Sequence, residues 1–551
     1  MYLRKTTRKN KDGSQVSYLA LAHNEWDAEK GYSKPSIIHS FGRTDQLDED
    51  ALRRLVRSIC RYLGPEDLLK YEALLEGRGD VRLENRKSIG GSWVLDQLWK
   101  ALGIQDVLHR TLQAREYRTP VERLIFAMVA NRALAPMSKL ALEEWVSEDV
   151  AIEGLEEVEV HQLYRAMDFL LQSSSKISWE VYCSISNLLN LEVDLLYFDT
   201  TSTYFEIEQE DEGFRRRGYS RDKRADRPQA VIGLAVTRDG IPVRCWVWPG
   251  NTADVSVIEE VKRDLVGWKL GRVISVLDRG FVSKDNLRTL QRAGGHYIMG
   301  EKMSSGKPEV EEALARPGRY RKVRDNLEIK EIIVGDGEAR HRYVLVRNPE
   351  QAERDCKTRE DIIARITEEL RNLRYLPEGQ HTRAICALRS HPVYGRYLRM
   401  LKNGQLRLDQ ARIRDSERLD GKYLIRTSDD TLSAEDVALG YKQLVDIEDA
   451  FRTLKQTLEI RPVYHRLEDR IRAHVTLCWL ALLLIRVAER KAGKTWERMR
   501  KILDRMIIAD IITSEGAITQ RTELTPNQKS IFRALKIEEP PRVTNIQTTR
   551  K

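Results

Sequence analysis

Residues 195–202 read LLYFDTTS, and residues 273–281 read VISVLDRGF. In each stretch a run of apolar residues ends at an aspartate, Asp199 in the first and Asp278 in the second. Short apolar runs that are rich in β-branched and aromatic residues are typical of buried strands. We therefore expect two strands of one buried sheet, each of which ends at a carboxylate.

The segments between and after these stretches predict how the two aspartates meet. Strand-like runs at 230–236 and 242–248 are joined by an Asp-Gly turn, which predicts a hairpin. Helical patterns at 255–265 and 284–293 flank the VISVL run, and a last strand is expected at 296–299. The predicted order is an antiparallel meander followed by α/β crossovers. This order resembles the RNase H-like fold, in which the ends of the first and fourth strands lie side by side.

A third acidic residue, Glu448, lies in a helical pattern that runs from Tyr441 to Leu458. The apolar residues of this pattern form one stripe along the predicted helix. A second stripe beside it holds Tyr441, Glu448, Arg452 and Lys455. We expect the glutamate at the rim of the buried face, within reach of the sheet edge. Taken alone, it also fits an ordinary exposed glutamate with an (i, i+4) arginine partner.

Together, Asp199, Asp278 and Glu448 can hold divalent metal ions, because Mg²⁺ prefers hard oxygen ligands. Two such ions, about 3.5–4 Å apart, stabilise the attacking and leaving oxygens when a phosphodiester is cut. Either aspartate alone could instead be a turn residue or a helix cap. A further acidic residue, Asp254, is expected to support this site or to start a helix. The sequence predicts two Mg²⁺ ions, for which Mn²⁺ can substitute.

Four short motifs surround the predicted strands. They are DTTS at 199–202, GYSRD at 218–222, GNTAD at 250–254 and DRGF at 278–281. In this order they resemble the blocks of prokaryotic insertion-sequence transposases of the DDE class. The resemblance extends over residues 195–490. It implies an enzyme that cuts DNA at the ends of its own mobile element and joins those ends to a new site.

One large cut-and-paste group of these transposases carries the signature Tyr-x2-Arg-x3-Glu-x6-Lys around its catalytic glutamate. Three of the four positions match here, at Tyr441, Glu448 and Lys455. Leu444 stands in the place of the arginine, so one contact with a phosphate or a DNA end is missing; Lys442 or Arg452 could replace it. The resemblance implies release of the element through a DNA hairpin, with the tyrosine and the lysine steadying the strand.

Residues 215–227 form a basic segment between the first two strands, with seven basic and two acidic residues. Such a segment is often only a solvated loop, but its position close to Asp199 predicts contacts with phosphates. The predicted DNA-binding residues are Tyr441, Arg452, Lys455, Arg215, Arg216, Arg217, Arg221, Lys223 and Arg224.

Composition excludes several classes of protein. The net charge of +9, from 93 Lys+Arg and 84 Asp+Glu, suits a polyanionic partner only where basic residues cluster. The 6 cysteines are widely spaced without a C-x-x-C pair, which argues against a zinc ribbon and indicates reduced thiols. The N-terminus lacks a secretory pattern, and the apolar stretch 475–485 is too short to cross a bilayer. We expect a prokaryotic cytoplasmic protein, associated with the nucleoid and without membrane contact.

The expected fold class is α/β, with an RNase H-like catalytic core, an inserted α+β subdomain and a β-hairpin/helical N-terminal region. The expected parts are a hairpin-plus-helix unit (1–88), a helical domain (89–190), the first part of the core (191–300), the insertion (301–420), the second part of the core with the glutamate helix (421–490) and a basic C-terminal helical region (491–551). For the helical domain, DNA binding and a purely structural role are both open. The resemblance implies that the insertion faces DNA, and a packing or dimer-contact module is the alternative.

The expected partners are double-stranded DNA, both at the element ends and at the target, and a second copy of the chain when assembled on DNA. Two other functions remain open. An RNase H-like host nuclease would share the three carboxylates but would hydrolyse DNA without joining it. A catalytically retired DNA-binding protein derived from a transposase would be expected to have lost at least one carboxylate.

Overall fold

The computed structural model describes residues 1–10, 15–27, 31–48, 51–52, 55, 59, 82–113, 119–189, 195–211, 213–267, 273–292, 295–303, 307–337, 340–461, 463, 465–513 and 516–548. Most of the helix predicted in the first 88 residues lies outside this set. The chain divides into two compact units. One contains residues 1–84, 511–518 and 545–551, and the other contains 85–510 and 519–544.

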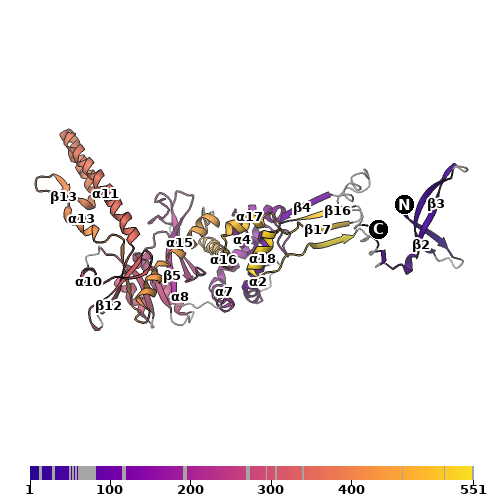
Figure 1. The fold of residues 1–551 in the computed structure, drawn as a ribbon, viewed down its shortest axis with the longest axis horizontal. Helices are drawn as coiled ribbons and strands as arrows, with labels where there is room; N and C mark the ends of the chain where they lie inside the picture. Colours follow the sequence, from indigo (N-terminus) through magenta and orange to yellow (C-terminus); the bar gives the residue numbers. More distant parts are fainter. Residues whose placement is uncertain are drawn as a thin grey trace. The chain divides into compact units, whose positions relative to one another are not determined.

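The N-terminal segment of the first unit forms a three-stranded antiparallel sheet in the order β1-β2-β3 (Figure 1). The predicted hairpin is present as β1 (Tyr2–Lys9) and β2 (Gln15–Asp27). The third strand, β3 (Tyr32–Arg43), was not expected from the sequence. It contains Pro35 and is largely exposed, so it lacks the alternation of apolar residues that marks a strand.

The second unit is built on a nine-stranded sheet in the order β10-β11-β12-β15-β9-β8-β5-β6-β7. The strands that the sequence predicted are β5 (Leu195–Tyr204), β6 (Gln229–Thr237), β7 (Pro242–Pro249), β8 (Ile274–Leu277) and β9 (His296–Glu301). β5 pairs antiparallel with β6 and parallel with β8, which in turn is parallel to β9. This confirms the RNase H-like order of the core. The helices α8 (Ile258–Gly267) and α9 (Lys284–Gln291) form the crossovers.

The other four strands of the sheet come from later in the chain. They are β10 (Arg321–Arg324), β11 (Leu327–Val334), β12 (His341–Arg347) and β15 (Lys422–Thr427). β15 pairs antiparallel with both β9 and β12, so the core sheet continues without a gap into β12 and β11. The insertion was expected to be α+β, and its strands β10, β11 and β12 extend the core sheet.

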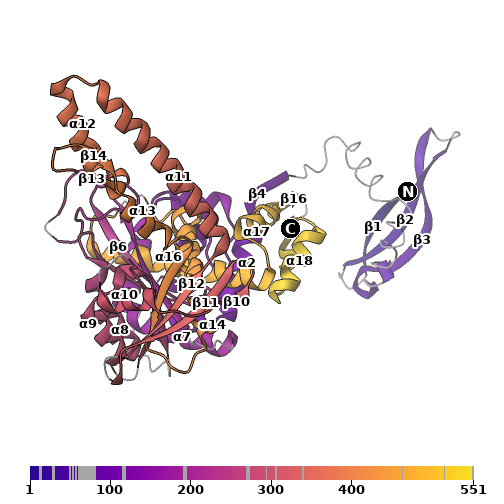
Figure 2. The same ribbon diagram turned by 60° about the vertical axis from the view of Figure 1, so that its left-hand side comes forward.

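The remainder of the insertion is mostly helical and has a small core of its own. α11 (Pro349–Asn372) and α12 (Glu378–Ser390) lie side by side in Figure 2, and α13 (Gln410–Glu417) follows them. A short hairpin, β13 (Leu398–Met400) with β14 (Leu406–Leu408), packs against α11 through Ile366. The insertion therefore presents its own folded surface next to the sheet.

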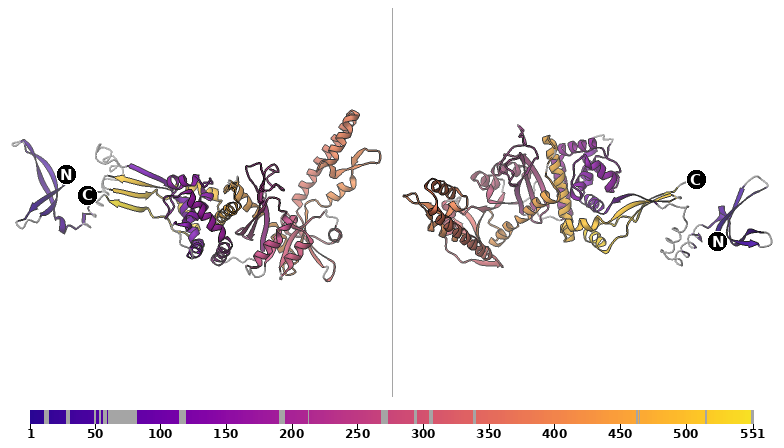
Figure 3. Two further views of the ribbon diagram at one scale, coloured as in Figure 1. Left: turned by 180° about the vertical axis from the view of Figure 1, so that it is seen from behind. Right: turned by 90° about the horizontal axis from the view of Figure 1, so that it is seen from above.

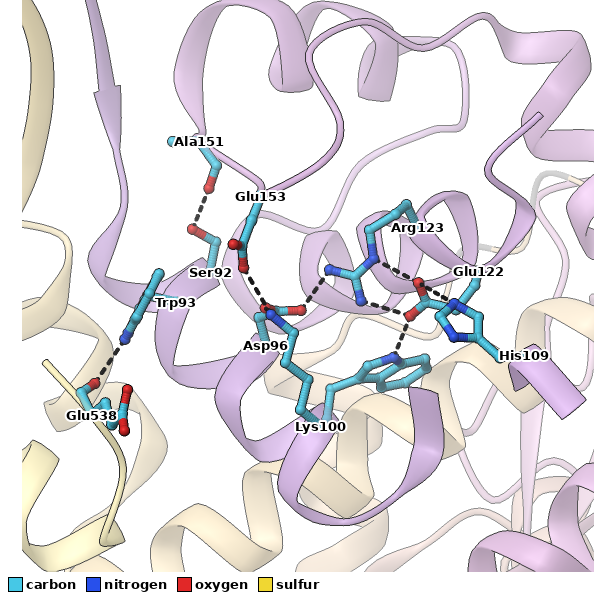
Figure 4. A network of polar contacts seen from close by, with 11 residues as sticks. Ser92, Trp93, Asp96, Lys100, His109, Glu122, Arg123, Ala151, Glu153 and Glu538 are labelled. Carbon is cyan, nitrogen blue, oxygen red and sulfur yellow. Dashed lines mark hydrogen bonds and ion pairs between the residues drawn. The ribbon is translucent and has the colours of Figure 1, made fainter. Parts of the chain in front are cut away.

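Most of the described residues between 90 and 189 are helical. The helices include α2 (Gly90–Ala101), α3 (Ile104–Leu112), α4 (Val121–Leu134), α6 (Val160–Gln172) and α7 (Ser174–Leu189). α4 is buried on almost every side, which is characteristic of a central core helix. A charged network joins α2 to α4 (Figure 4). In it, the Arg123 guanidinium lies 2.6 Å from both Asp96 and Glu122, and the Trp99 ring nitrogen donates to Glu122.

The helix α16 (Glu468–Ala492) connects the helical part to the sheet, because it contacts α4, α6 and β7 (Figure 3). Among the described residues it is the one helix long and apolar enough to cross a membrane, but 89% of its apolar window is buried inside the protein. Such burial marks the core helix of a folded domain. The apolar stretch 475–485 lies within it.

The C-terminal segment contains strands as well as the expected helices. α17 (Trp496–Leu503) and α18 (Pro526–Leu535) are helical. β16 (Ile507–Thr513), β17 (Gly516–Arg521) and β18 (Val543–Thr548) form a four-stranded sheet with β4 (Arg82–Ser88), in the order β18-β17-β16-β4.

Candidate active site

The parallel pairing of β5 with β8 places two carboxylates next to each other. Phe198 pairs with Leu277, and the next residues along the two strands are Asp199 and Asp278. Asp278 directly follows β8, as expected. Asp199 does not end its strand, because β5 continues to Tyr204 in its pairing with β6. It stands instead where the shorter neighbour β8 stops, so the Asp199 side chain lies at the step between the two strands and is 21% exposed.

Burial raises the pKa of Asp199 to about 6. The Arg221 charge and the Thr200 backbone N–H, which donates to Asp199 at 2.7 Å, act in the opposite direction. The charges of Asp278 and Asp254 raise this pKa further. Three carboxylates therefore converge at one sheet edge, where their mutual repulsion favours a cation.

The predicted continuous helix around Glu448 is broken, and that part of the prediction is wrong. α14 (Ala434–Lys442) ends just after Tyr441, and α15 (Val445–Arg452) begins after a turn at Leu444. The Gln443 side chain at this turn accepts a hydrogen bond from the Tyr197 hydroxyl at 2.7 Å. Residues 453–457 then form a turn of π-helix. Tyr441, Glu448 and Lys455 consequently do not share one helical stripe.

The break still brings Glu448 toward Asp278. Both line a cavity of about 340 Å³, together with Tyr441 and Leu444. The Glu448 side chain is exposed and makes no ion pair or hydrogen bond with any residue that the structure describes. α15 contacts β5 and β6, which fixes its position over the sheet. The glutamate is thus free to accept a ligand at this cavity.

Tyr441 holds Asp278 from the other side of the cavity. Its hydroxyl donates to Asp278 at 3.2 Å. Burial and the Asp278 charge raise the pKa of Tyr441, so the hydroxyl stays protonated and remains a donor. Gly300 on β9 leaves room for this ring, since a Cβ at that position would collide with the Tyr441 hydroxyl. No feature of the sequence pointed to Gly300.

The basic segment reaches the carboxylates through one arginine. Arg221 lies 3.3 Å from Asp199 and 2.7 Å from Asp254. Asp254 also accepts a 2.5 Å hydrogen bond from the Thr200 hydroxyl. The sequence expected Asp254 to support the site or to start a helix, and the 3-10 turn of residues 254–256 begins there.

The remaining predicted DNA-binding residues lie in several environments. Lys455 is 2.7 Å from Asp222, which also binds Arg461 at 2.5 Å. Arg215, Arg216 and Arg217 pair with acidic side chains or a backbone carbonyl at residues 208–211, just before the segment. Arg224 pairs with Asp226 within the segment, and Arg452 pairs with Asp449. Lys223 is exposed and has no ion-pair partner among the described residues. The sequence missed the role of Asp222, because no spacing rule connects residues 233 positions apart.

A second cavity, of about 890 Å³, lies between the core and the insertion. On one side it is lined by Arg279, which directly follows Asp278, and by Lys302, which directly follows β9. On the insertion side it is lined by Arg396 and Arg412, with Asp415 as its one acidic residue. This concentration of positive charge is the kind of surface that attracts a polyanion.

Among the described residues, no group of three or more His, Cys, Asp or Glu side chains is arranged closely enough to hold a metal ion as it stands. The donor chemistry nevertheless fits a hard cation, since the groups that converge are carboxylates. A cationic group, the Arg221 guanidinium, already lies between the carboxylates of Asp199 and Asp254. Asp199, Asp278 and Glu448 are the residues that would hold the ions.

Comparison with family models matches residues 198–484, more than half of the 551-residue chain, to the transposase DDE domain. The chain belongs to the DDE transposase family. Residues 3–67 also match the N-terminal domain of IS1634 family transposases. The protein is thus a DNA transposase of the insertion-sequence type, as the order of its motifs predicted.

A solved structure of the piggyBac transposase synaptic complex with hairpin DNA is similar over 75% of this transposase and 77% of that chain, with 10% sequence identity and a TM-score of 0.32. A comparison with curated proteins gave no match.

Proposed function

We propose that this transposase cuts DNA at the ends of its insertion element and joins them to target DNA, using divalent metal ions held by Asp199, Asp278 and Glu448. Two Mg²⁺ ions are expected, and Mn²⁺ can substitute. The observation that carries the proposal is the register of β5 and β8, which makes Asp199 and Asp278 neighbours. Glu448 supports it, because it shares a cavity with Asp278.

Each residue around the site has a distinct task. Bound ions would stabilise charge on the attacking and leaving oxygens of the phosphodiester. The Tyr441 hydroxyl holds the Asp278 carboxylate in place, and the Thr200 backbone N–H does the same for Asp199. Leu444 lines the cavity with an apolar side chain, so the contact that an arginine would make there must come from elsewhere.

We assign the contacts with the DNA backbone to two surfaces. The first is the basic segment of residues 215–227 with Tyr441, Arg452 and Lys455. The second is the cavity between the core and the insertion, where Arg279, Lys302 and Arg396 have no ion-pair partner among the described residues. Because Arg279 directly follows Asp278, a strand held at the carboxylates would continue toward this cavity. The insertion would then grip the DNA next to the cut.

The partners follow from the reaction. Cleavage at two element ends requires double-stranded DNA at both ends and at the target, and we propose that two copies of the chain assemble on that DNA. We place the protein in the prokaryotic cytoplasm, in association with the nucleoid.

The test of this function is a cleavage assay on duplex DNA that carries the element end, in Mg²⁺. Asp278→Asn should slow cleavage at least about a thousandfold, equivalent to about 4 kcal/mol in the barrier. The matched control is Asp285→Asn, which should cleave normally. It changes an exposed aspartate of α9 that lies 3.8 Å from its basic partner. Near wild-type cleavage by Asp278→Asn would reject the assignment.

A second readout separates a transposase reaction from simple hydrolysis. Labelled end DNA with a free 3′-hydroxyl is incubated with target plasmid, and joined products are counted. The proposal predicts joining by the wild-type protein and its loss in Asp278→Asn. Cleavage without any joining would indicate nuclease activity alone.

A further inference from the structure

Two adjacent residues of the basic segment, Arg221 and Asp222, make ion pairs in opposite directions. Arg221 binds acidic residues beside β5, whereas Asp222 binds basic residues beyond α15. The segment is therefore attached at one point to both halves of the proposed active site. This inference rests on the proposed function of that site.

On one side, Arg221 occupies the space where positive charge is needed. Its guanidinium bridges Asp199 at 3.3 Å and Asp254 at 2.7 Å. The Arg221 backbone N–H also donates to the Ser202 hydroxyl at 3.0 Å, which ties the segment to β5. A metal ion bound to Asp199 would compete with the Arg221 guanidinium for the same carboxylate, because two positive charges repel each other at such short range.

On the other side, Asp222 neutralises a lysine that the resemblance assigns to DNA. The Asp222 side chain is only 7% exposed, and Lys455 lies 2.7 Å from it with 15% exposure. Arg461 is a second basic partner of Asp222, at 2.5 Å, and it lies over the Tyr204 ring. While these contacts persist, neither cation can pair fully with a phosphate.

We propose that Arg221 and Asp222 form a latch that positions Asp199 and Lys455 in the DNA-free transposase and opens when metal and DNA bind. In the closed state Arg221 supplies the counter-charge for the carboxylates, and Asp222 supplies it for Lys455. Opening releases a carboxylate to the metal site and basic groups to the DNA backbone at the same time. Metal binding and DNA binding are thereby coupled through one short segment, and each ligand should strengthen the other.

The direct test is Mn²⁺ binding to the full-length, DNA-free protein, followed by the loss of the electron paramagnetic resonance signal of free Mn²⁺. Arg221→Gln should bind Mn²⁺ about tenfold more tightly than wild type, because the competing charge is gone. Arg221→Lys should be intermediate, since one ammonium cannot bridge two carboxylates as a guanidinium does. The matched control is Arg244→Gln on β7, which removes the same charge from a 2.8 Å pair with Asp264 of α8 and should not change the affinity.

The Asp222 end of the latch is tested by Asp222→Asn, with circular dichroism to verify the fold. A latch predicts tighter Mn²⁺ binding, although residue 222 does not touch the carboxylates, because the segment is released. Unchanged or weaker binding in Arg221→Gln, with Mn²⁺ still bound by wild type, would overturn the latch alone. If no variant and no wild-type protein binds Mn²⁺, both the latch and the metal site are wrong.

Discussion

At the scale of the residue, each carboxylate of the site has a different environment. Burial raises the pKa of the Asp199 carboxyl, and the Arg221 charge limits that rise. Asp278 receives the Tyr441 hydroxyl, and Glu448 faces a cavity without a partner among the described residues. The three acidic residues could be selected from the sequence because each follows or lies within a distinct apolar pattern. Arg221 and Asp222 could not be paired with their partners, because long-range ion pairs leave no local pattern.

Gly300 provides a test of how Tyr441 is positioned. Gly300→Ala should reduce cleavage of end DNA about ten- to a hundredfold, because the added methyl group displaces the Tyr441 hydroxyl from Asp278. Gly379→Ala is the control, since a Cβ there meets no atom within 4 Å. The double variant Gly300→Ala, Tyr441→Phe removes the closest collision together with the hydrogen bond, and the ring carbon Cζ remains 2.9 Å from the added Cβ. Wild-type cleavage by Gly300→Ala would show that Tyr441 does not position Asp278.

Lys139 is a buried residue whose titration should affect stability. It is 4% exposed, and burial together with the nearby Arg132 lowers its pKa to about 7. Between this value and the ordinary pKa near 10.5, the unfolded chain binds the proton and the folded chain does not. The contribution of Lys139 to the free energy of unfolding therefore rises with pH across that window. Below pH 7 both states carry the proton, and the folded chain bears the full cost of the buried charge.

Lys139→Met should consequently stabilise the protein by about 1–4 kcal/mol at pH 7. The difference from wild type should shrink as the pH approaches 10, because the unfolded chain then also loses the proton and burying the neutral amine requires less deprotonation work. Urea unfolding at several pH values measures this difference. Lys176→Met, at an exposed lysine 3.8 Å from Glu180, should give no comparable change. A gap between Lys139→Met and wild type that is constant with pH would contradict the assigned titration.

At the scale of the element, the strands of the core were predictable and the glutamate helix was not. The runs that form β5 to β9 are short, apolar and bounded by turn residues, so local pattern and tertiary structure agree. The helical pattern from Tyr441 to Leu458 is also continuous, yet the chain turns at Gln443 and Leu444. There Gln443 meets Tyr197 of β5, and this tertiary contact accompanies the break in the local helical pattern. Strands were predicted at 330–334 and 342–346, which lie in β11 and β12, whereas β10 was not predicted. Only the pairing of β12 with β15 reveals that these strands extend the core sheet.

The cavity between the core and the insertion gives a prediction about charge. Each phosphate that the protein neutralises steepens the salt dependence of binding by about 0.9 in the slope of log K against log salt. Replacing Lys302 and Arg396 together by glutamine should therefore reduce that slope for end DNA by between one and two. Filter binding over a range of salt concentrations measures it.

A matched control for this charge effect is Arg383→Gln on α12. This arginine is exposed and does not line the cavity, so its removal should leave the slope nearly unchanged. An equal effect of both changes would mean that the cavity has no special role and that only net charge matters.

At the scale of the whole molecule, the chain forms two compact units, and the insertion interrupts the sequence of the core. The sheet gathers strands from residues 195–301, 321–347 and 422–427, and the helix α15 returns after the insertion to complete the cavity at Asp278. The buried helix α16 packs the helical region against β7, so residues far apart in sequence form one core. The order of the parts was readable from sequence, whereas the joining of the insertion's first strands to the core was not.

The central claim is that Asp199, Asp278 and Glu448 hold the metal ions. The most direct measurement is the anomalous difference map of crystals grown with Mn²⁺ and element-end DNA. We predict Mn²⁺ peaks in contact with the carboxylates of Asp199 and Asp278, with Glu448 turned toward them and Arg221 withdrawn from Asp199. Mn²⁺ peaks away from these carboxylates, or no peak while Arg221 still bridges Asp199 and Asp254 on bound DNA, would contradict the account.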